Sequence, residues 1–238
     1  MSAAKPLAGI EVAVLAGGLG SRVAAILGET PKILAPVGDR CFLDCLLDQL
    51  AGLGAAKVVL CLGHLADKVL AHLRAVPPAL PVEWVVEDHP LGTAGALALA
   101  RPRLASDPVL VMNGDTWLVA DYAGFTAAHR QAVSPASVLC VGVDDVARYG
   151  AISLSDSGLV QRFAEKGGRG PGLINGGAVL LSTAALARLP EQGGLERDVL
   201  EPLVGHGLRG FADPRARFID IGTPQTLAQA ETVIGGGP

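Results

Sequence analysis

Apolar runs of strand length alternate with segments of helical period along the first half of the chain. Strands are predicted at 10–15, 57–62, 82–86 and 109–112, and helices at 42–53, 65–73 and 93–100. Strands joined by crossover helices form parallel sheets that helices cover on both faces. The pattern therefore predicts an α/β fold with a mostly parallel sheet.

The pattern changes in the second half of the chain. Alternation continues through one helix and one strand, and three short strand candidates separated by glycines then follow. One more strand and one more helix close the chain. These elements are predicted at 122–132, 136–141, 150–154, 159–163, 177–181, 218–221 and 225–234. We expect one domain over residues 1–238, with a mixed sheet and a small antiparallel insertion.

The first predicted strand runs into a glycine-rich loop. Residues 15–22 read Leu-Ala-Gly-Gly-Leu-Gly-Ser-Arg, and Pro31-Lys32 follow ten residues after Arg22. Glycines let bare backbone amides turn towards an anion, and Arg22 and Lys32 add two positive charges. We interpret this stretch as a cradle for a triphosphate.

Other nucleotide sites that place a glycine loop after a strand fit the spacing less well. A dinucleotide fingerprint requires a small residue where Val23 stands, and an acid ending the next strand about 20 residues on, where Asp39 instead follows Pro36-Val37-Gly38. A P-loop closes on Gly-Lys-Ser/Thr, which Gly20-Ser21-Arg22 does not supply. A tight turn without a ligand would leave the two cations unexplained.

Composition limits the class of partner. The net charge is −4, half the residues are apolar, and Lys and Arg form no cluster, which argues against nucleic acid binding. The apolar runs are shorter than the roughly 18 residues of a spanning helix, and the N-terminus has no signal-peptide pattern, so we expect a cytoplasmic protein without a membrane partner. The cysteines are expected to be reduced core thiols rather than metal ligands or disulfides: Cys41, Cys45, Cys61 and Cys140.

The glycine loop is the first of several motifs that match one enzyme family in the right order. The string AGGLGSR with its following PK resembles the signature of the sugar nucleotidyltransferases, which make nucleoside-diphosphate sugars from a nucleoside triphosphate and a sugar 1-phosphate. The resemblance continues through LGTAG (91–95), NGD (113–115), RYGAI (148–152), EK (165–166), INGG (174–177) and FIDIGTP (218–224). It therefore covers nearly the whole chain.

The resemblance implies a Rossmann-like, three-layer α/β/α nucleotidyltransferase fold of the glycosyltransferase-A-like type. Within the single domain, a nucleotide-binding half is expected at about 8–142 and a sugar-phosphate-binding lobe at about 143–215, with a closing strand and helix at 216–235. The oligomeric state stays open, with a homodimer as one option. No additional β-helix domain is expected after Pro238.

Two aspartates follow predicted strands. Asp115 comes after the strand at 109–112, at the strand end where open α/β sheets place ligand chemistry, and Asp220 ends a late strand. Alone, either residue could be a helix N-cap or a turn aspartate. Mg²⁺ prefers hard oxygen ligands, and the resemblance implies that both aspartates hold Mg²⁺ between the phosphates of the two substrates.

The expected chemistry needs no general base. A sugar phosphate near pH 7 is already largely a dianion, because the second pKa of a phosphomonoester is about 6. Its oxygen is the nucleophile, and catalysis consists of positioning and charge stabilisation. The five scattered histidines are expected to be solvated or core residues. The catalytic set implied by the resemblance is Arg22, Lys32, Asp115 and Lys166.

The choice of base is assigned to Glu87, which follows the strand at 82–86. In related enzymes this position meets the base edge together with the backbone of the following glycine. A carboxylate only accepts hydrogen bonds; guanine offers two adjacent donors, whereas uracil and thymine offer one donor between two carbonyls. We therefore expect GTP as the donor. The alternative is that Glu87 only caps the helix that begins near Thr93.

The resemblance also implies the residues of the two substrate sites. The nucleotide site is expected to comprise Leu15, Ala16, Gly17, Gly18, Gly20, Ser21, Arg22, Lys32, Glu87, Gly92, Thr93 and Asn113. The sugar-phosphate site is expected to comprise Gly150, Glu165, Lys166, Asn175 and Gly176. In it, Glu165 accepts sugar hydroxyls and Lys166 meets the phosphate. An ordinary surface ion pair is the alternative for these two residues.

Longer stretches narrow the expected substrates. GHLAD (63–67), LGTAG, LERDVL (195–200) and FIDIGTP are similar to the guanylyltransferases that act on D-glycero-D-manno-heptose 1-phosphate, followed by those that act on mannose 1-phosphate. The expected function is GDP-heptose synthesis for surface polysaccharides. A mannose substrate, a uridylyl or thymidylyl donor, and a non-catalytic nucleotide-sugar sensor are the alternatives.

Overall fold

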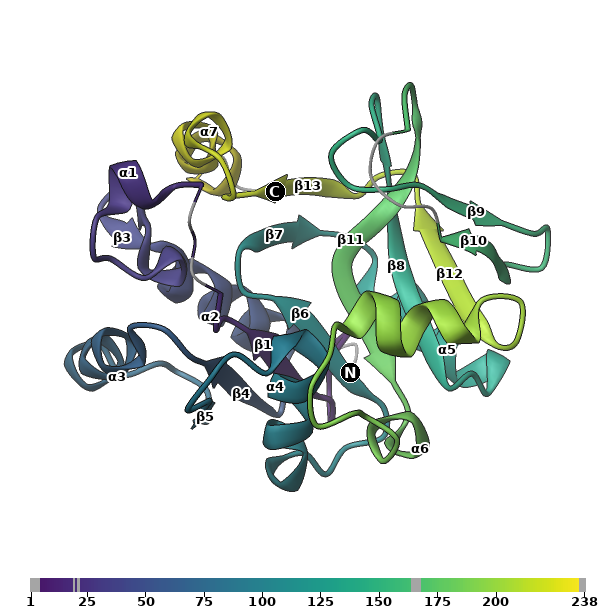
Figure 1. The fold of residues 1–238 in the computed structure, drawn as a ribbon, viewed down its shortest axis with the longest axis horizontal. Coiled ribbons are helices and arrows are strands. Elements are labelled where there is room, and N and C mark those ends of the chain that lie inside the picture. The colour runs from purple at the N-terminus through teal and green to yellow at the C-terminus, as the bar shows by residue number, and fades with distance from the viewer. Residues whose placement is uncertain (1–4, 19, 21, 164–167, 236–238) are drawn as a thin grey trace.

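A mixed β-sheet is the framework of the molecule (Figure 1). The computed structural model describes residues 5–18, 20, 22–163 and 168–235, and nine strands in them form this sheet. These strands are β1 (Glu11–Leu15), β4 (Lys57–Leu62), β5 (Val82–Val86), β6 (Val109–Asn113), β8 (Ala136–Val143), β9 (Ile152–Leu154), β10 (Val160–Phe163), β11 (Gly172–Leu181) and β12 (Leu208–Asp213).

Two small sheets and the helices complete the fold over the described residues. β2 (Pro36–Val37) pairs with β3 (Arg40–Cys41), and β7 (Thr116–Val119) pairs with β13 (Arg217–Asp220). The helices are α1 (Ala24–Leu27), α2 (Phe42–Leu53), α3 (Ala66–Ala75), α4 (Gly92–Ala100), α5 (Tyr122–Ala132), α6 (Thr183–Leu186) and α7 (Pro224–Gly235). Short 3₁₀ turns lie at Lys32–Leu34, Arg101–Arg103 and Glu201–Leu203, and a π-helical turn at Glu196–Leu200.

The sheet is parallel in its first half and mixed in its second. β1 lies between β4 and β6, and β5 lies outside β4, all in parallel. β11 runs antiparallel to β6 and to β8, and β12 runs parallel to β8. Short antiparallel β9 and β10 extend the sheet beyond β11. The predicted mixed sheet with a small antiparallel insertion is therefore confirmed.

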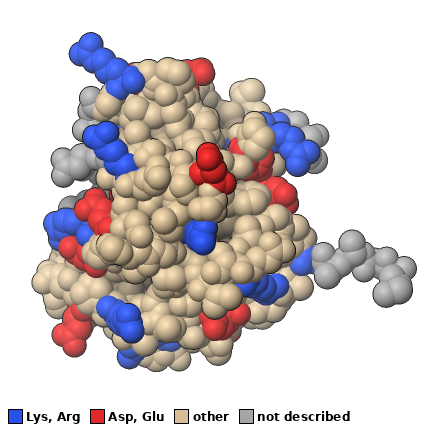
Figure 2. Space-filling view, turned by 90° about the vertical axis from the view of Figure 1, so that its right-hand side faces the viewer, with Lys and Arg blue, Asp and Glu red and all other residues tan. Residues whose placement is uncertain are grey.

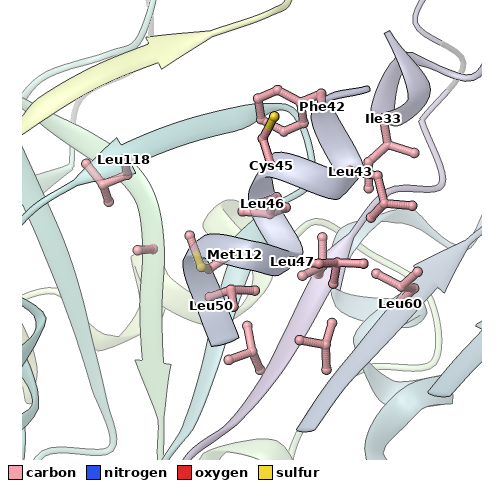
Figure 3. Packing of buried hydrophobic residues seen from close by; sticks show 14 of the residues in the cluster. Ile33, Phe42, Leu43, Cys45, Leu46, Leu47, Leu50, Leu60, Met112 and Leu118 are labelled. Atoms are coloured by element: carbon pink, nitrogen blue, oxygen red, sulfur yellow. The ribbon is translucent and has the colours of Figure 1, made fainter. Parts of the chain in front are cut away.

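Both faces of the sheet are buried in its parallel half. On β1, Val12 and Val14 belong to one hydrophobic cluster and Ala13 to another, because successive side chains point to opposite faces. Helix α2 packs on the first face, where Leu43, Leu46, Leu47 and Leu50 recur with helical spacing and meet side chains of the strands (Figure 3). Helix α4 packs against β1, β4 and β5. The result is the expected three-layer α/β/α arrangement.

Several elements begin and end where the local pattern predicts. α2, β4 and α5 match their predicted bounds at both ends. Helix α2 ends because Gly54 takes a left-handed conformation, with φ of 84°, in which a side chain would also collide with Lys5. These boundaries depend on local sequence, so the sequence alone predicts them.

Other elements differ from the prediction. The strand predicted at 218–221 is β13, which does not join the main sheet but pairs with β7, a strand that was not predicted. β12 was also not predicted, and β11 begins at Gly172, five residues before its predicted start at 177. Glycines and polar residues interrupt the apolar pattern in β12 and in the first half of β11, and β7 is only four residues long. Pairing with distant strands defines these segments instead.

Charged side chains are scattered over the surface view in Figure 2. On that face Lys and Arg are interspersed with Asp and Glu among uncharged residues. No helix in the described part of the chain is long and apolar enough to cross a bilayer. All four cysteines, which lie in described residues, are free; three are buried as expected, but Cys41 is half-buried at the N-cap of α2.

Candidate active site

Two adjoining cavities open at the carboxyl ends of the parallel strands. The larger has a volume of about 750 Å³ and the smaller about 430 Å³. These values are in the range of small-molecule sites. The cavities share part of their lining, contributed by Leu15, Arg22, Thr93, Asn113 and Asp115. The arrangement can hold two ligands side by side.

The glycine loop after β1 forms one wall of the larger cavity. Its described residues from Leu15 to Gly20 line the cavity, and no described atom lies within 4 Å of the position that a Cβ of Gly18 would take. Gly20 has a φ of 59°, which favours glycine, and a Cβ there would lie 3.5 Å from the Cβ of Lys32. The loop therefore exposes backbone to the cavity and lies close to Lys32. Ser21 lies outside the described residues.

Two cations converge on the cavity beside Gly222. Lys32 forms an ion pair with Asp115, and its side chain is 14% exposed. A Cβ on Gly222 would lie 3.3 Å from Lys32 Nζ, 3.6 Å from Arg22 Nη2 and 2.5 Å from Asp220 Oδ1. The missing side chain at Gly222 thus leaves room for both cations next to a carboxylate. This arrangement is suited to binding a multiply charged anion.

Asp220 is held by three donors. The Tyr149 hydroxyl donates to Oδ2 at 2.7 Å, Arg148 Nη2 donates to the same oxygen at 3.2 Å, and the Gly222 amide donates to Oδ1 at 2.9 Å. Burial, followed by the hydrogen bond to Asp220, raises the pKa of Tyr149 to about 12. Tyr149 therefore stays a donor at neutral pH, and the Asp220 carboxylate is oriented before any ligand arrives.

The two aspartates come together because β13 returns to β7. Asp220 lies opposite Thr116 in that pairing, and the Ile221 amide donates to the Asp115 carbonyl at 2.9 Å. Carboxylates are the hard oxygen ligands that a divalent cation prefers. The two carboxylates that the resemblance implies as metal ligands, Asp115 and Asp220, thus lie at the same cavity wall and offer oxygen donors suited to such an ion.

Glu87 uses its two carboxylate oxygens differently. Oε2 accepts a hydrogen bond from the Leu91 amide at 3.0 Å, at the N-cap of α4, so the capping contact considered from the sequence exists. Oε1 lies between the loops after β1 and β4, 2.9 Å from where a Cβ of Gly17 would be and 2.6 Å from that of Gly63. Both loops and Glu87 line the larger cavity. One oxygen caps the helix while the other approaches these loops.

The smaller cavity is lined by β11 and by the π-helical turn. The Asn175 side chain donates to Glu196 Oε1 at 2.9 Å and accepts from the Gly177 amide at 2.9 Å. The Leu195 amide donates to Thr93 Oγ1 at 2.7 Å, which attaches the turn to the start of α4. The contact between Leu195 and Thr93 joins residues 102 positions apart, so that α4, the π-helical turn and β11 form one wall.

The structure brings most of the predicted site residues to the cavities. All described members of the predicted nucleotide site line the larger cavity, and Asn175 lines the smaller. Gly150 and Gly176 are buried and do not appear in either lining; the Gly150 amide donates to the Val146 carbonyl at 3.1 Å. Glu165 and Lys166 lie outside the described residues.

Some lining residues were not predicted. Arg148, Tyr149 and Gly222 stand inside two of the quoted motifs, RYGAI and FIDIGTP, but had no assigned role. Glu196 and Arg197 line the smaller cavity, and a charged pair in a helical pattern is usually a solvated surface feature. Only the packing of the π-helical turn against α4 reveals that they face a cavity.

Residues 11–235 match the family described as Nucleotidyl transferase. The chain belongs to this family. The nucleotidyl transferases use a divalent metal, and the paired aspartates supply oxygen ligands for one.

The relatives of this nucleotidyl transferase are similar over most of its length. It is 29% identical to the D-glycero-alpha-D-manno-heptose 1-phosphate guanylyltransferase of Aneurinibacillus thermoaerophilus, over 93% of this chain and 97% of that protein. It is also 29% identical to the mannose-1-phosphate guanylyltransferase of Mycobacterium tuberculosis, over 96% of this chain but 66% of that protein.

A solved structure shares the fold. HddC from Yersinia pseudotuberculosis superimposes with a TM-score of 0.85 and 32% identity, covering 94% of this chain and 99% of that one. HddC complexed with GMP-PN superimposes with a TM-score of 0.84 at the same identity. The three-layer fold is thus common to this nucleotidyl transferase and HddC.

Proposed function

We propose that the protein transfers a guanylyl group from GTP to D-glycero-D-manno-heptose 1-phosphate and releases pyrophosphate. The observation that carries this proposal is the pair of cavities that meet at Asp115, one lined by the glycine loop with Arg22 and Lys32 and the other by Asn175. Such a cleft suits two phosphorylated substrates that must react with each other. The similarity to heptose 1-phosphate guanylyltransferases supports the choice of sugar.

In the proposed reaction, a phosphate oxygen of the sugar 1-phosphate attacks the α-phosphorus of GTP. The bond from that phosphorus to the oxygen that bridges to the β-phosphate breaks, and pyrophosphate leaves with the bonding electrons. No proton has to be removed from the nucleophile near pH 7, because a phosphomonoester is then largely a dianion. The residues therefore act by positioning and by charge stabilisation.

Arg22 and Lys32 bind the phosphates of the donor in this scheme. Both cations reach the space beside Gly222, so they neutralise charge on the α-phosphate and on the leaving pyrophosphate. Asp115 and Asp220 would hold Mg²⁺. When bound, the ion lowers the repulsion between the phosphates of the two substrates. Lys166 and Glu165, outside the described residues, are proposed for the sugar phosphate.

Glu87 is proposed to select guanine. Its Oε1 approaches the loops after β1 and β4, at the wall of the larger cavity. An ionised carboxylate can accept both N1–H and the N2 amino group of guanine. The hydrogen bond from Leu91 to Oε2 holds the side chain in place for that contact. Glu87 can thus both cap helix α4 and recognise guanine.

Mannose 1-phosphate is the second candidate acceptor. The similarity to the mannose-1-phosphate guanylyltransferase of Mycobacterium tuberculosis extends over 96% of this chain. Both acceptors present the same phosphate to the cleft and differ in the sugar. We propose the cytoplasm as the place of action, where both nucleotides and sugar phosphates are available.

A substrate panel tests the proposal. GTP, UTP, dTTP and ATP are each combined with heptose 1-phosphate, mannose 1-phosphate and glucose 1-phosphate in the presence of Mg²⁺, and released pyrophosphate is measured. The highest kcat/KM is expected for GTP with heptose 1-phosphate. A higher kcat/KM for GTP with mannose 1-phosphate would identify mannose 1-phosphate, rather than heptose 1-phosphate, as the acceptor substrate. If calorimetry detects binding of GDP-sugars but no substrate pair is turned over, the protein would be a non-catalytic nucleotide-sugar sensor and the proposed enzymatic function would be wrong.

A further inference from the structure

Three side chains with metal-binding atoms meet away from the cleft. Cys41 ends β3 and is the N-cap of α2, Asp44 lies in the first turn of α2, and His72 lies on α3. His72 Nε2 is 2.7 Å from Asp44 Oδ1 and 3.4 Å from Cys41 Sγ. All three potential ligand atoms lie within 4.8 Å of one another. None of the three residues is in the lining of the two described cavities.

The chemistry of this cluster suits a borderline-soft cation. Thiolate, imidazole and carboxylate are the ligands of Zn²⁺, whereas Mg²⁺ takes oxygen ligands and does not select a thiolate. Zn–S and Zn–N bonds of about 2.3 and 2.0 Å place tetrahedral S and N ligands about 3.5 Å apart. The 3.4 Å between Cys41 Sγ and His72 Nε2 is close to that spacing. The contact from His72 to Asp44 needs to open by only about half an ångström.

The cluster is accessible to an ion from solvent. The side chains of His72 and Asp44 are 23% and 15% exposed, and Cys41 is half-buried. A water molecule can therefore complete a tetrahedral set as the fourth ligand. Cys41 starts as a neutral thiol, because burial raises its pKa to about 12. Binding moves the thiol proton to solvent as the sulfur electron pair forms the metal bond. Without the metal, His72 Nε2 donates its proton to the Asp44 carboxylate; on binding, the imidazole changes tautomer, so that the proton lies on Nδ1 and the Nε2 lone pair forms the bond to the ion.

We propose that Cys41, Asp44 and His72 form a Zn²⁺ site that ties α3 to the start of α2. The sequence predicts Cys41 as a plain core thiol, because nothing in the chain pattern shows that α3 lies against it. The fold puts the cluster next to the segment that carries Lys32: the Phe42 amide donates to the Ala35 carbonyl at 2.9 Å, directly after the Lys32–Leu34 turn. The ion would have a structural role, holding α3 against the start of α2.

Metal binding by the purified full chain tests the proposal. After treatment with a chelator, the protein is titrated with Zn²⁺ alone while excess Mg²⁺ occupies the carboxylates of the cleft. One Zn²⁺ per chain is expected, with a rise in Tm. Replacement by Co²⁺ is expected to produce a thiolate-to-metal charge-transfer band together with the visible bands of a tetrahedral site. These readouts do not involve turnover, so the proposal and the proposed function can fail separately.

Substitutions test whether the Zn²⁺ binding and the charge-transfer band of Co²⁺ arise from Cys41, Asp44 and His72. Cys41→Ser is expected to abolish the charge-transfer band, and Cys41→Ser, Asp44→Asn and His72→Ala each to weaken Zn²⁺ binding at least about 10-fold. The matched controls Cys45→Ala and His206→Ala should keep both properties. If Cys41→Ser does not fold by circular dichroism, His72→Ala, at a partly exposed position, carries the test. Absence of saturable Zn²⁺ binding, or binding by Cys41→Ser and His72→Ala equal to that of the unmodified protein, would overturn the proposal.

Discussion

Lys32 and Asp115 form an ion pair at the wall of the larger cavity although 83 residues separate them in the chain. Lys32 comes from the 3₁₀ turn before α2, and Asp115 follows β6. Each charge is thereby kept in the cavity by its partner. When substrates bind, Lys32 can exchange the Asp115 carboxylate for a phosphate oxygen, which is also negatively charged. Asp115 can in turn exchange the Lys32 ammonium for a metal cation. The pair is therefore the first target for mutation.

Loss of either member of this pair should slow the reaction strongly. Lys32→Ala or Asp115→Asn is expected to lower the rate at least about 100-fold, or about 2.7 kcal/mol of barrier, because the first removes a positive charge beside the transferring group and the second removes a proposed ligand of Mg²⁺. Steady-state pyrophosphate release measures this. Lys68→Ala and Asp48→Asn alter exposed ion pairs elsewhere and should leave the rate unchanged. Near-normal turnover of Lys32→Ala would contradict the assignment.

Glu87→Gln should change the choice of nucleotide. The amide keeps one acceptor but replaces the other with a donor, which faces the donors of guanine, so the ratio of kcat/KM for GTP over UTP is expected to fall at least about 10-fold. Glu83→Gln is the matched control, since Glu83 lies on β5, the strand that Glu87 follows, and pairs with Lys57 and Arg103. An unchanged ratio would leave Glu87 as a helix cap.

Tyr149→Phe should weaken the use of metal. The substitution removes the 2.7 Å hydrogen bond that orients the Asp220 carboxylate. Loss of such a supporting bond typically costs 10–100-fold in metal affinity, so the Mg²⁺ concentration for half-maximal velocity is expected to rise at least about 10-fold, with a smaller change in kcat at saturating Mg²⁺. Tyr122→Phe removes a buried hydrogen bond to Leu118 and should affect stability instead. Equal Mg²⁺ dependence in both variants would argue against a metal at Asp220.

Stability should fall in mild acid because of His129. This histidine is buried and bonded to Ser137, and burial lowers its pKa below the ordinary value of 6.5. Above that value the side chain is neutral in both states; below it the unfolded chain takes up a proton that the folded chain resists, so the free energy of unfolding decreases as the pH falls.

Urea denaturation at about pH 8 and about pH 5.5 measures this effect. His129→Asn keeps a polar atom near Ser137 but cannot titrate, and the loss of stability between the two pH values should be smaller than in the unmodified protein. His206→Asn changes an exposed histidine and should keep the full loss. An identical loss in His129→Asn would show that other groups cause the pH dependence.

Local patterns determine a large part of the fold. The bounds of α2, β4 and α5 follow from the sequence because helical period, strand-length apolar runs and a terminal glycine such as Gly54 act over a few residues. The glycine loop, Lys32, Glu87 and Asp115 could be placed at the site because each follows a predicted strand or a motif. The ends of parallel strands meet at one edge of a sheet, and that rule needs no coordinates.

The tertiary structure decides which distant segments touch. The pairing of β13 with β7 brings Asp220 to Asp115, the approach of α3 to α2 brings His72 to Cys41, and the packing of the π-helical turn on α4 turns Glu196 towards a cavity. None of these contacts leaves a periodic trace in the chain, because each depends on surfaces that form only when separate elements pack together. The sequence by itself determines most of the helices and the parallel strands, the glycine loop and the family; the tertiary structure alone determines strands such as β7 and β12, how Tyr149 holds Asp220 and where the Cys41 cluster forms.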